Sequence, residues 1–378
     1  MRARDFGIPF SGKCGKYNAI TDVPGVEVGF STLNYGEAKA DIVYSSDFAR
    51  TGVTAILPRG KKRSAVFAGR ADLNGNGELT GTHWIDDSGF LHGPIMITNT
   101  NSVGIVRDTV SKWMVDNEYF YPAYADGKEI KRLGYFYPTV GETFDGTLNN
   151  INGFKVKPEH VLEALNNAKS GPVLEGNVGG GTGMCCLGFK GGTGTASRIV
   201  KTSFNKEYTI AALVQTNFGT RDELTIKGIP VGKLIKGVER KIVAPAPKEG
   251  EGSIIVVLAS DAPLLPWQLT KIARRATIGI SKVGGGNHSG SGDIFIAFST
   301  ANEDGFTYTK TSVELLADQE LDPFFKAAGD VVEESILNAL IAAEDMYGRN
   351  LNFVPALPHD QLKDILDKYS NLLETYKQ

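Results

Sequence analysis

The sequence predicts an α/β protein in which amphipathic helices cover β-sheets that are buried on both faces. The segment 253–259 is apolar at every position after its first serine, which is typical of a strand covered on both sides. The segment 360–376 instead carries apolar residues at three- and four-residue spacing, as a helix with one buried face does. Such elements pack as layers around a core. Because no repeat or linker divides the 378 residues, we expect one unit, 1–378.

Turn signals and apolar periodicity give the order of the elements. Asp22-Val-Pro-Gly25 predicts a turn, and Pro158 suits the first turn of a helix. Helices and strands are told apart by the spacing of their apolar residues. We expect strands at 26–30, 54–58, 93–98, 208–215, 253–259 and 293–298, and helices at 103–115, 158–168, 264–276, 323–347 and 360–376.

Composition and charge exclude several classes of protein. The net charge is −3, with no long run of one sign, so the sequence favours neither a nucleic-acid partner nor a membrane surface. No stretch reaches the roughly 18 apolar residues that span a bilayer, and no signal peptide is recognisable at the first residues. The three cysteines are odd in number and do not form a disulfide framework. We therefore expect a cytoplasmic protein.

The junction between Gly252 and Ser253 is the first candidate for chemistry. A polar loop rich in proline and glycine, 244–252, runs directly into the buried strand whose first residue is Ser253, and we expect this loop to be exposed and mobile. Glycine leaves its own carbonyl open to attack and tolerates a distorted backbone. Attack by the Ser253 hydroxyl on that carbonyl would release an N-terminal serine, whose α-amine can act as its own general base. Taken alone, these residues also fit an ordinary turn before a strand.

Three other segments offer polar groups of suitable types. Ser291 and Asp293 are two residues apart, so in an extended chain they share a face and can pass or orient a proton. Asn217 ends a strand, where its amide could donate to an oxyanion. Glu142 lies in a turn-like segment between apolar stretches and could hold a substrate ammonium group. Each also has a plain structural interpretation, as a local turn or a solvated side chain.

Metal and nucleotide sites are not expected. The five histidines are scattered, and Cys185-Cys186 lacks zinc-ligand spacing. The glycine-rich segment 176–197 does not match a phosphate-binding loop, because Phe189 occupies the lysine position, so a lining or close-packing role is favoured. A serine–histidine–aspartate triad through His288 stays open, although the Gly-x-Ser-x-Gly motif is absent. We expect no metal and no cofactor.

Taken together, the segments resemble the DmpA/BapA-type aminopeptidases, that is, the L-aminopeptidase/D-esterase-amidase family and its β-peptidyl aminopeptidase relatives. The similarity runs nearly from end to end, and the order and spacing of its pieces make it specific. The matching segments are 18–26, 141–146, 176–183, 190–197, 252–257, 261–266 and 291–302.

The resemblance implies a four-layer αββα sandwich, usually assembled as a tetramer of αβ units. It implies self-cleavage into an α chain, 1–252, and a β chain, 253–378. Ser253 would be the nucleophile, assisted by Ser291 and Asp293, with aspartate where some relatives have glutamate.

The resemblance also implies the remaining roles in the site. Asn217 would be the oxyanion donor, and Glu142 would hold the substrate's free amine. Two positions depart from the pattern. Phe144 stands where some relatives have tyrosine or tryptophan, so a hydroxyl donor is lost from the substrate-binding site, and Phe30 replaces a histidine.

The expected activity is removal of N-terminal residues from small peptides, amides or esters. An acyltransferase on a related architecture is one alternative, although that family uses a threonine nucleophile. A catalytically silent protein that binds small molecules is another.

Overall fold

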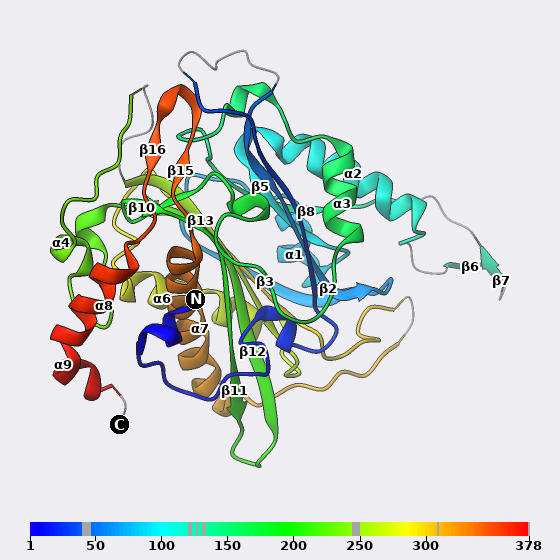
Figure 1. The fold of residues 1–378 in the computed structure, drawn as a ribbon. Helices are drawn as coiled ribbons and strands as arrows, with labels where there is room; N and C mark the ends of the chain where they lie inside the picture. The colour runs from blue at the N-terminus through cyan, green and yellow to red at the C-terminus, as the bar shows by residue number, and fades with distance from the viewer. Residues whose placement is uncertain are drawn as a thin grey trace.

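The computed structural model describes residues 1–39, 47–119, 123–125, 128–130, 134–243, 250–307 and 310–376. Two β-sheets lie face to face at its centre, and helices cover the outer face of each (Figure 1). The first sheet has the strand order β1-β2-β5-β8, and the second has the order β11-β12-β13-β14-β3-β4. The layers are therefore helices, sheet, sheet and helices, which confirms the αββα arrangement.

The strands of the two large sheets and the helices have the following bounds. The first sheet consists of β1 Glu27–Tyr35, β2 Ala49–Lys61, β5 Ile95–Asn99 and β8 Thr139–Thr143. The second consists of β11 Gly192–Lys201, β12 Glu207–Gly219, β13 Gly250–Ser260, β14 Gly292–Ser299, β3 Val66–Gly75 and β4 Phe90–Leu91. The α-helices are α1 Thr82–Ser88, α2 Val103–Asp116, α3 Pro158–Asn166, α4 Val231–Leu234, α5 Pro266–Ala273, α6 Ala276–Lys282, α7 Asp322–Ala342, α8 His359–Lys368 and α9 Ser370–Glu374.

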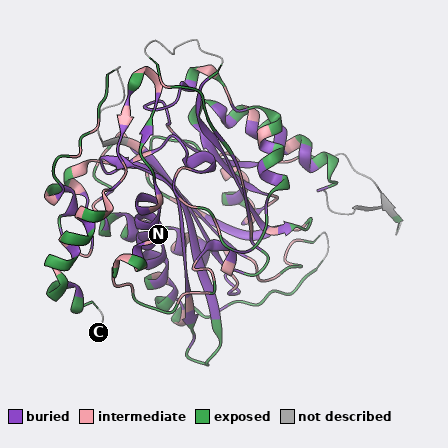
Figure 2. Cartoon of the chain, in the orientation of Figure 1, coloured by how far each residue is buried: buried purple, intermediate pink, exposed green. Residues whose placement is uncertain are grey.

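Strand alternation divides the apolar side chains between three cores. In β13, Ile255 and Val257 point into the core between the sheets, whereas Ile254 and Val256 point toward the helices. Helices α5, α6 and α7 close the core on the outer face of the second sheet. Helices α2 and α3 close a third core, on the outer face of the first sheet. Figure 2 shows both sheets and α7 as almost entirely buried, while α2, α3 and α8 expose one face. Burial on both faces explains why β13 is apolar throughout.

Most expected elements are present, but several bounds differ. The expected helix 323–347 ends at Ala342, and the expected helix 360–376 is divided into α8 and α9 at Tyr369, which leaves helical geometry. The helix expected at 264–276 is α5, and a separate helix, α6, follows it. These breaks are set by packing against neighbouring elements, which apolar spacing alone does not report.

The loop expected at 244–252 was wrong in its last three residues. Residues 250–252 belong to β13, because they continue its pairing with β12, where Gly250 lies opposite Gly219. A bulge between Asn217 and Gly219 absorbs the change in register. Residues 244–249, the rest of that loop, lie outside the described residues.

The glycine-rich segment after residue 176 serves close packing. Gly180 and Gly181 form part of a 3₁₀ turn, Gly179–Gly181, that lies against both sheets. A Cβ atom on Gly180 would lie 2.1 Å from the Gln215 side-chain oxygen, and one on Gly181 would lie 2.5 Å from the Thr193 nitrogen. No larger residue fits this turn, which agrees with the close-packing interpretation.

Candidate active site

Ser253 lies near the start of β13, between two neighbouring strands of the second sheet. Its Cα is paired with that of Asn217 on β12 and with that of Gly292 on β14. Because Ser253 alternates with Ile254, its side chain is on the face that looks toward the first sheet. The residue is 4% exposed. Its hydroxyl is thus held inside the sandwich, at one end of the interface between the sheets.

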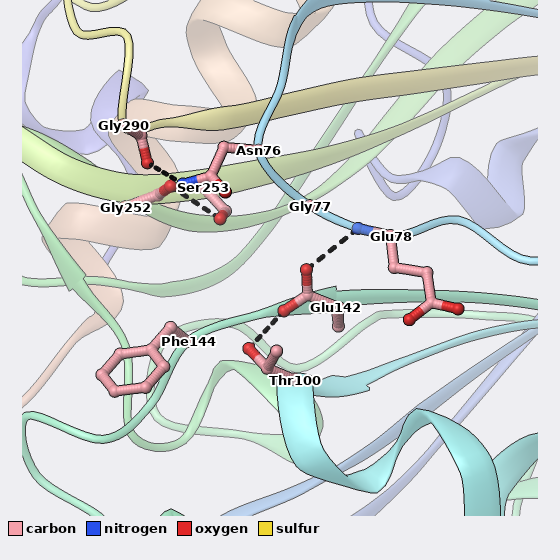
Figure 3. A pocket seen from close by; sticks show the side chains of 9 residues that line it. All are labelled: Asn76, Gly77, Glu78, Thr100, Glu142, Phe144, Gly252, Ser253 and Gly290. Atoms are coloured by element: carbon pink, nitrogen blue, oxygen red, sulfur yellow. Dashed lines mark hydrogen bonds between the residues drawn. The ribbon is translucent and has the colours of Figure 1, made fainter.

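The Ser253 hydroxyl is next to the peptide bond that precedes it. Its Oγ donates a hydrogen bond of 2.6 Å to the carbonyl oxygen of Gly252, as Figure 3 shows. A serine hydroxyl next to the carbonyl of the preceding residue is the starting arrangement for an N-to-O acyl shift.

Gly252 is required by a close approach of backbone. A Cβ atom at this position would lie 1.9 Å from the carbonyl oxygen of Asn217 and 3.1 Å from the Cα of Phe218. Gly252 is not among the described residues with positive φ, so a left-handed backbone is not the reason for glycine at this position. Glycine is needed here because β12 leaves no space for a side chain.

Asn217 is fixed by hydrogen bonds from both ends of its amide. Its Nδ2 donates to the carbonyl oxygen of Phe144 at 2.9 Å, and its Oδ1 accepts from the Cys185 nitrogen at 2.9 Å. Within the described ranges the other N–H of this amide has no acceptor, so it is available for one. Since Asn217 is the cross-strand partner of Ser253, that N–H is on the same face as the serine.

Glu142 comes from the other sheet, near the end of β8, and is 3% exposed. Its Oε1 accepts from the Glu78 main-chain nitrogen at 3.0 Å, and its Oε2 accepts from the Thr100 hydroxyl. Burial raises the pKa of this carboxyl, and the charge of Glu78 adds to the rise, while the two donors oppose it. A cation placed against Glu142 would relieve the cost of its buried charge.

A cavity of about 580 Å³ joins Ser253 to Glu142 (Figure 3). The serine and Gly252 are on its second-sheet side, and Glu142 and Phe144 are on its first-sheet side. The lining residues are Asn76, Gly77, Glu78, Thr100, Glu142, Phe144, Gly252, Ser253 and Gly290. The cavity therefore has a hydroxyl at one wall and a buried carboxylate at the opposite wall.

Ser291 and Asp293 are hydrogen-bonded to each other, with Ser291 Oγ donating to Asp293 Oδ1 at 2.6 Å. This is the same-face contact that their spacing predicts. Burial raises the pKa of the Asp293 carboxyl. Asp293 is paired with Ile254 rather than with Ser253, so strand alternation puts it on the helix side of the sheet. Within the part of the chain that the structure describes, neither residue forms a hydrogen bond with Ser253.

His288 does not form the triad that the sequence left open. Its Nε2 lies 3.0 Å from a carboxylate oxygen of Glu223, and among the described residues it has no contact with Ser253. The described residues also contain no group of three histidine, cysteine or acidic side chains arranged to hold a metal ion. In the same ranges, every helix is too short or too polar to cross a membrane.

Five of the nine residues that line the cavity were not among the predicted site residues: Asn76, Gly77, Glu78, Thr100 and Gly290. Two of these, Glu78 and Thr100, donate hydrogen bonds to Glu142. Thr100 follows the buried strand β5, and a hydroxyl just beyond a strand end could have marked it as a site residue. Glu78 lies in the turn-rich stretch Asn74-Gly-Asn-Gly-Glu78, which reads as an ordinary connection. Glu78 enters the site because the connection after β3 lies against β8, where Leu79 is opposite Gly141. Thr100 enters because β5, which it follows, is the strand partner of β8.

The chain matches the model of peptidase family S58 over residues 18–354. A β-peptidyl aminopeptidase, BapA, of Sphingosinicella microcystinivorans is 49% identical over 98% of this chain and 93% of its own length. The BapA of Sphingosinicella xenopeptidilytica is 41% identical over 97% of this chain and 90% of its own.

Solved structures give the same result. The L-aminopeptidase D-Ala-esterase/amidase of Ochrobactrum anthropi, a prototype serine aminopeptidase with a variant of the Ntn-hydrolase fold, superposes with a TM-score of 0.87 at 47% identity, over 98% of this chain and 99% of that one. A β-aminopeptidase of Burkholderia sp. superposes with a TM-score of 0.83 at 43% identity, over 97% and 99%. With the family model, the close relatives and the fold in agreement, the chain belongs to peptidase family S58 and is a serine aminopeptidase.

Proposed function

We propose that the chain cleaves itself between Gly252 and Ser253 and that the freed Ser253 is the nucleophile of the aminopeptidase. The observation that carries this proposal is the cavity in which the Ser253 hydroxyl, next to the Gly252 carbonyl, faces the buried Glu142 carboxylate. In the first step, Oγ attacks the Gly252 carbonyl carbon and the peptide nitrogen leaves. Water then hydrolyses the ester, which gives a Gly252 carboxylate and a free α-amine on Ser253.

The mature enzyme uses that amine as the general base. A terminal amine has a pKa of about 7.7–8.0, so a large fraction is neutral near that pH and can take the Oγ proton as the hydroxyl attacks the substrate carbonyl. The leaving amine departs, and water releases the acyl group from Ser253. The free N–H of Asn217 is positioned to donate to the oxyanion, because Asn217 is the cross-strand partner of the nucleophile.

Glu142 is the proposed anchor for the substrate's own N-terminal ammonium. Its burial and its two donors fix the carboxylate in one place, and an incoming cation supplies the missing charge. A substrate held there presents its first carbonyl group toward Ser253 across the cavity, so residues are removed one at a time from the N-terminus. We propose small peptides, amides and esters as substrates. Because the close relatives are β-peptidyl aminopeptidases, we include N-terminal β-amino acid residues.

We assign Ser291 and Asp293 a role at the Ser253 nitrogen rather than at its hydroxyl. They flank Gly292, the strand partner of Ser253, but belong to the other face of the sheet. From there, the hydrogen-bonded pair can orient the new amine or exchange a proton with it.

The topology is compatible with a cut chain that stays assembled. Strand β13 pairs with β12, and β14 pairs with β3, so the strands after the cleavage point are central in a sheet whose outer strands precede it. An α chain, 1–252, and a β chain, 253–378, would share their cores. We also propose that the αβ units form a tetramer in the cytoplasm.

The test is Ser253→Ala, analysed by denaturing gel, intact mass and hydrolysis of an alanine amide. The wild-type chain should give fragments of 252 and 126 residues, the smaller beginning at Ser253, and the variant should stay whole and inactive. An active Ser253→Ala protein would overturn the proposal.

A further inference from the structure

Glu78 contributes a second carboxylate to the substrate cavity. It lies between β3 and α1, and its main-chain N–H donates to Glu142 at 3.0 Å. Its side chain lines the cavity and is exposed, and Figure 3 shows it extending beside Glu142. The two groups are close enough for the charge of Glu78 to raise the pKa of Glu142. Both carboxylates therefore line the same cavity.

The Glu78 carboxylate has no partner of its own in this cavity. Within the described residues, no side chain donates a hydrogen bond to it and no ion pair includes it. None of the nine residues that line the cavity is a lysine, an arginine or a histidine. Among the residues that the structure describes, the cavity lining thus offers two carboxylates and no compensating cation, whereas one carboxylate suffices to hold one N-terminal ammonium group.

We propose that Glu78 is a specificity-determining residue that makes the enzyme prefer substrates whose N-terminal residue carries a second positive charge on its side chain, as lysine, ornithine and arginine do. This inference rests on the proposed function, since Glu142 is taken to hold the α-ammonium. The side-chain cation would then pair with Glu78, at the solvent side of the cavity. Because Glu78 is exposed, solvent weakens the attraction, and we expect a preference of roughly three- to tenfold.

The experiment compares two amides that have the same length and differ by one charge. Lysine p-nitroanilide and norleucine p-nitroanilide are hydrolysed by the wild type and by Glu78→Gln, and the ratio of kcat/KM for lysine to that for norleucine is measured in each. We expect the ratio to fall by roughly three- to tenfold in the variant. In the wild type, the ratio should also decline when sodium chloride is raised from low concentration to 0.5 M, because exposed charges are screened.

Glu78→Lys is the matched variant, and it should lower the ratio further because it repels the side-chain cation. Self-cleavage and circular dichroism verify that each variant is folded, and the salt dependence of the wild type needs no variant. Equal ratios in wild type and Glu78→Gln, or an equal loss for both amides, would overturn the assignment of Glu78 while leaving the proposed function intact. A wild-type enzyme that hydrolyses neither amide would overturn this inference, and the proposed function would fall only if self-cleavage and hydrolysis of the alanine amide were also absent.

Discussion

Replacing Gly252 with alanine tests whether the close approach of β12 and β13 is needed for self-cleavage. The added Cβ atom would lie 1.9 Å from the Asn217 carbonyl oxygen and 2.9 Å from its carbonyl carbon. Both are backbone atoms in the middle of a sheet, so no flexible side chain can move aside. Ordinary contact begins at 3.4 Å, so the strand must shift by roughly 1.5 Å, at a cost of about 1–3 kcal/mol or more for overpacking.

The shift displaces the two groups that react. The distance from Ser253 Oγ to the Gly252 carbonyl oxygen is 2.6 Å. Both atoms belong to the segment that moves. A misplacement of about 1 Å reduces the rate of a well-oriented reaction by roughly 100-fold. Since the required shift is larger than this, we expect the self-cleavage rate of Gly252→Ala to fall by at least that factor in a chain that still folds.

The assay follows the full-length chain and its fragments by denaturing gel and intact mass over time after purification, with circular dichroism as the check on folding. Gly104→Ala is the matched control, because a Cβ atom at that exposed position of α2 meets nothing within 4 Å. The control should cleave at the wild-type rate and gain up to about 1 kcal/mol of helix stability. Cleavage of Gly252→Ala at the wild-type rate would refute the reasoning from close approach.

Two further predictions concern buried carboxyl groups. Glu142→Gln should lower kcat/KM for amide substrates by roughly 10- to 100-fold, because a charged hydrogen bond to the ammonium is lost. Since burial raises the pKa of Glu142, the wild-type kcat/KM should fall on acidification at a higher pH than an ordinary glutamate would give, and a pH profile without that limb contradicts the anchor role. Asp145 is fully buried, and burial raises its pKa to about 7. Between about pH 4 and pH 7, the native state therefore holds a proton that the unfolded state has lost. The stability that this proton contributes is complete below about pH 4 and is lost as the pH rises toward 7. Asp145→Asn should remove this loss, which is on the order of 4 kcal/mol. In thermal unfolding, the Tm of the variant should therefore gain on that of the wild type between pH 5 and pH 8, and a Tm difference independent of pH would contradict the buried, protonated Asp145.

Periodicity and turn chemistry predict much of the fold. The apolar run of β13 and the spacing in α3 are local properties, and the structure has both elements close to the expected places. The site is less accessible to such reasoning. Sequence motifs identified Ser253, Glu142 and Asn217, but the spacing of motifs along the chain does not tell how far apart the residues are in space. Only the packing of the two sheets brings these residues together.

The sequence by itself determined the class of fold, the family and the type of nucleophile, because those depend on composition, periodicity and motifs that are contiguous along the chain. The tertiary structure alone decided why Gly252 must be glycine, which face of the sheet carries Asp293, and that Glu78 enters the substrate cavity. Each of these depends on the approach of segments distant in sequence: β12 beside β13, β14 beside β13, and the connection after β3 over β8. Such approaches follow from register and from the packing of layers, which only the folded chain defines.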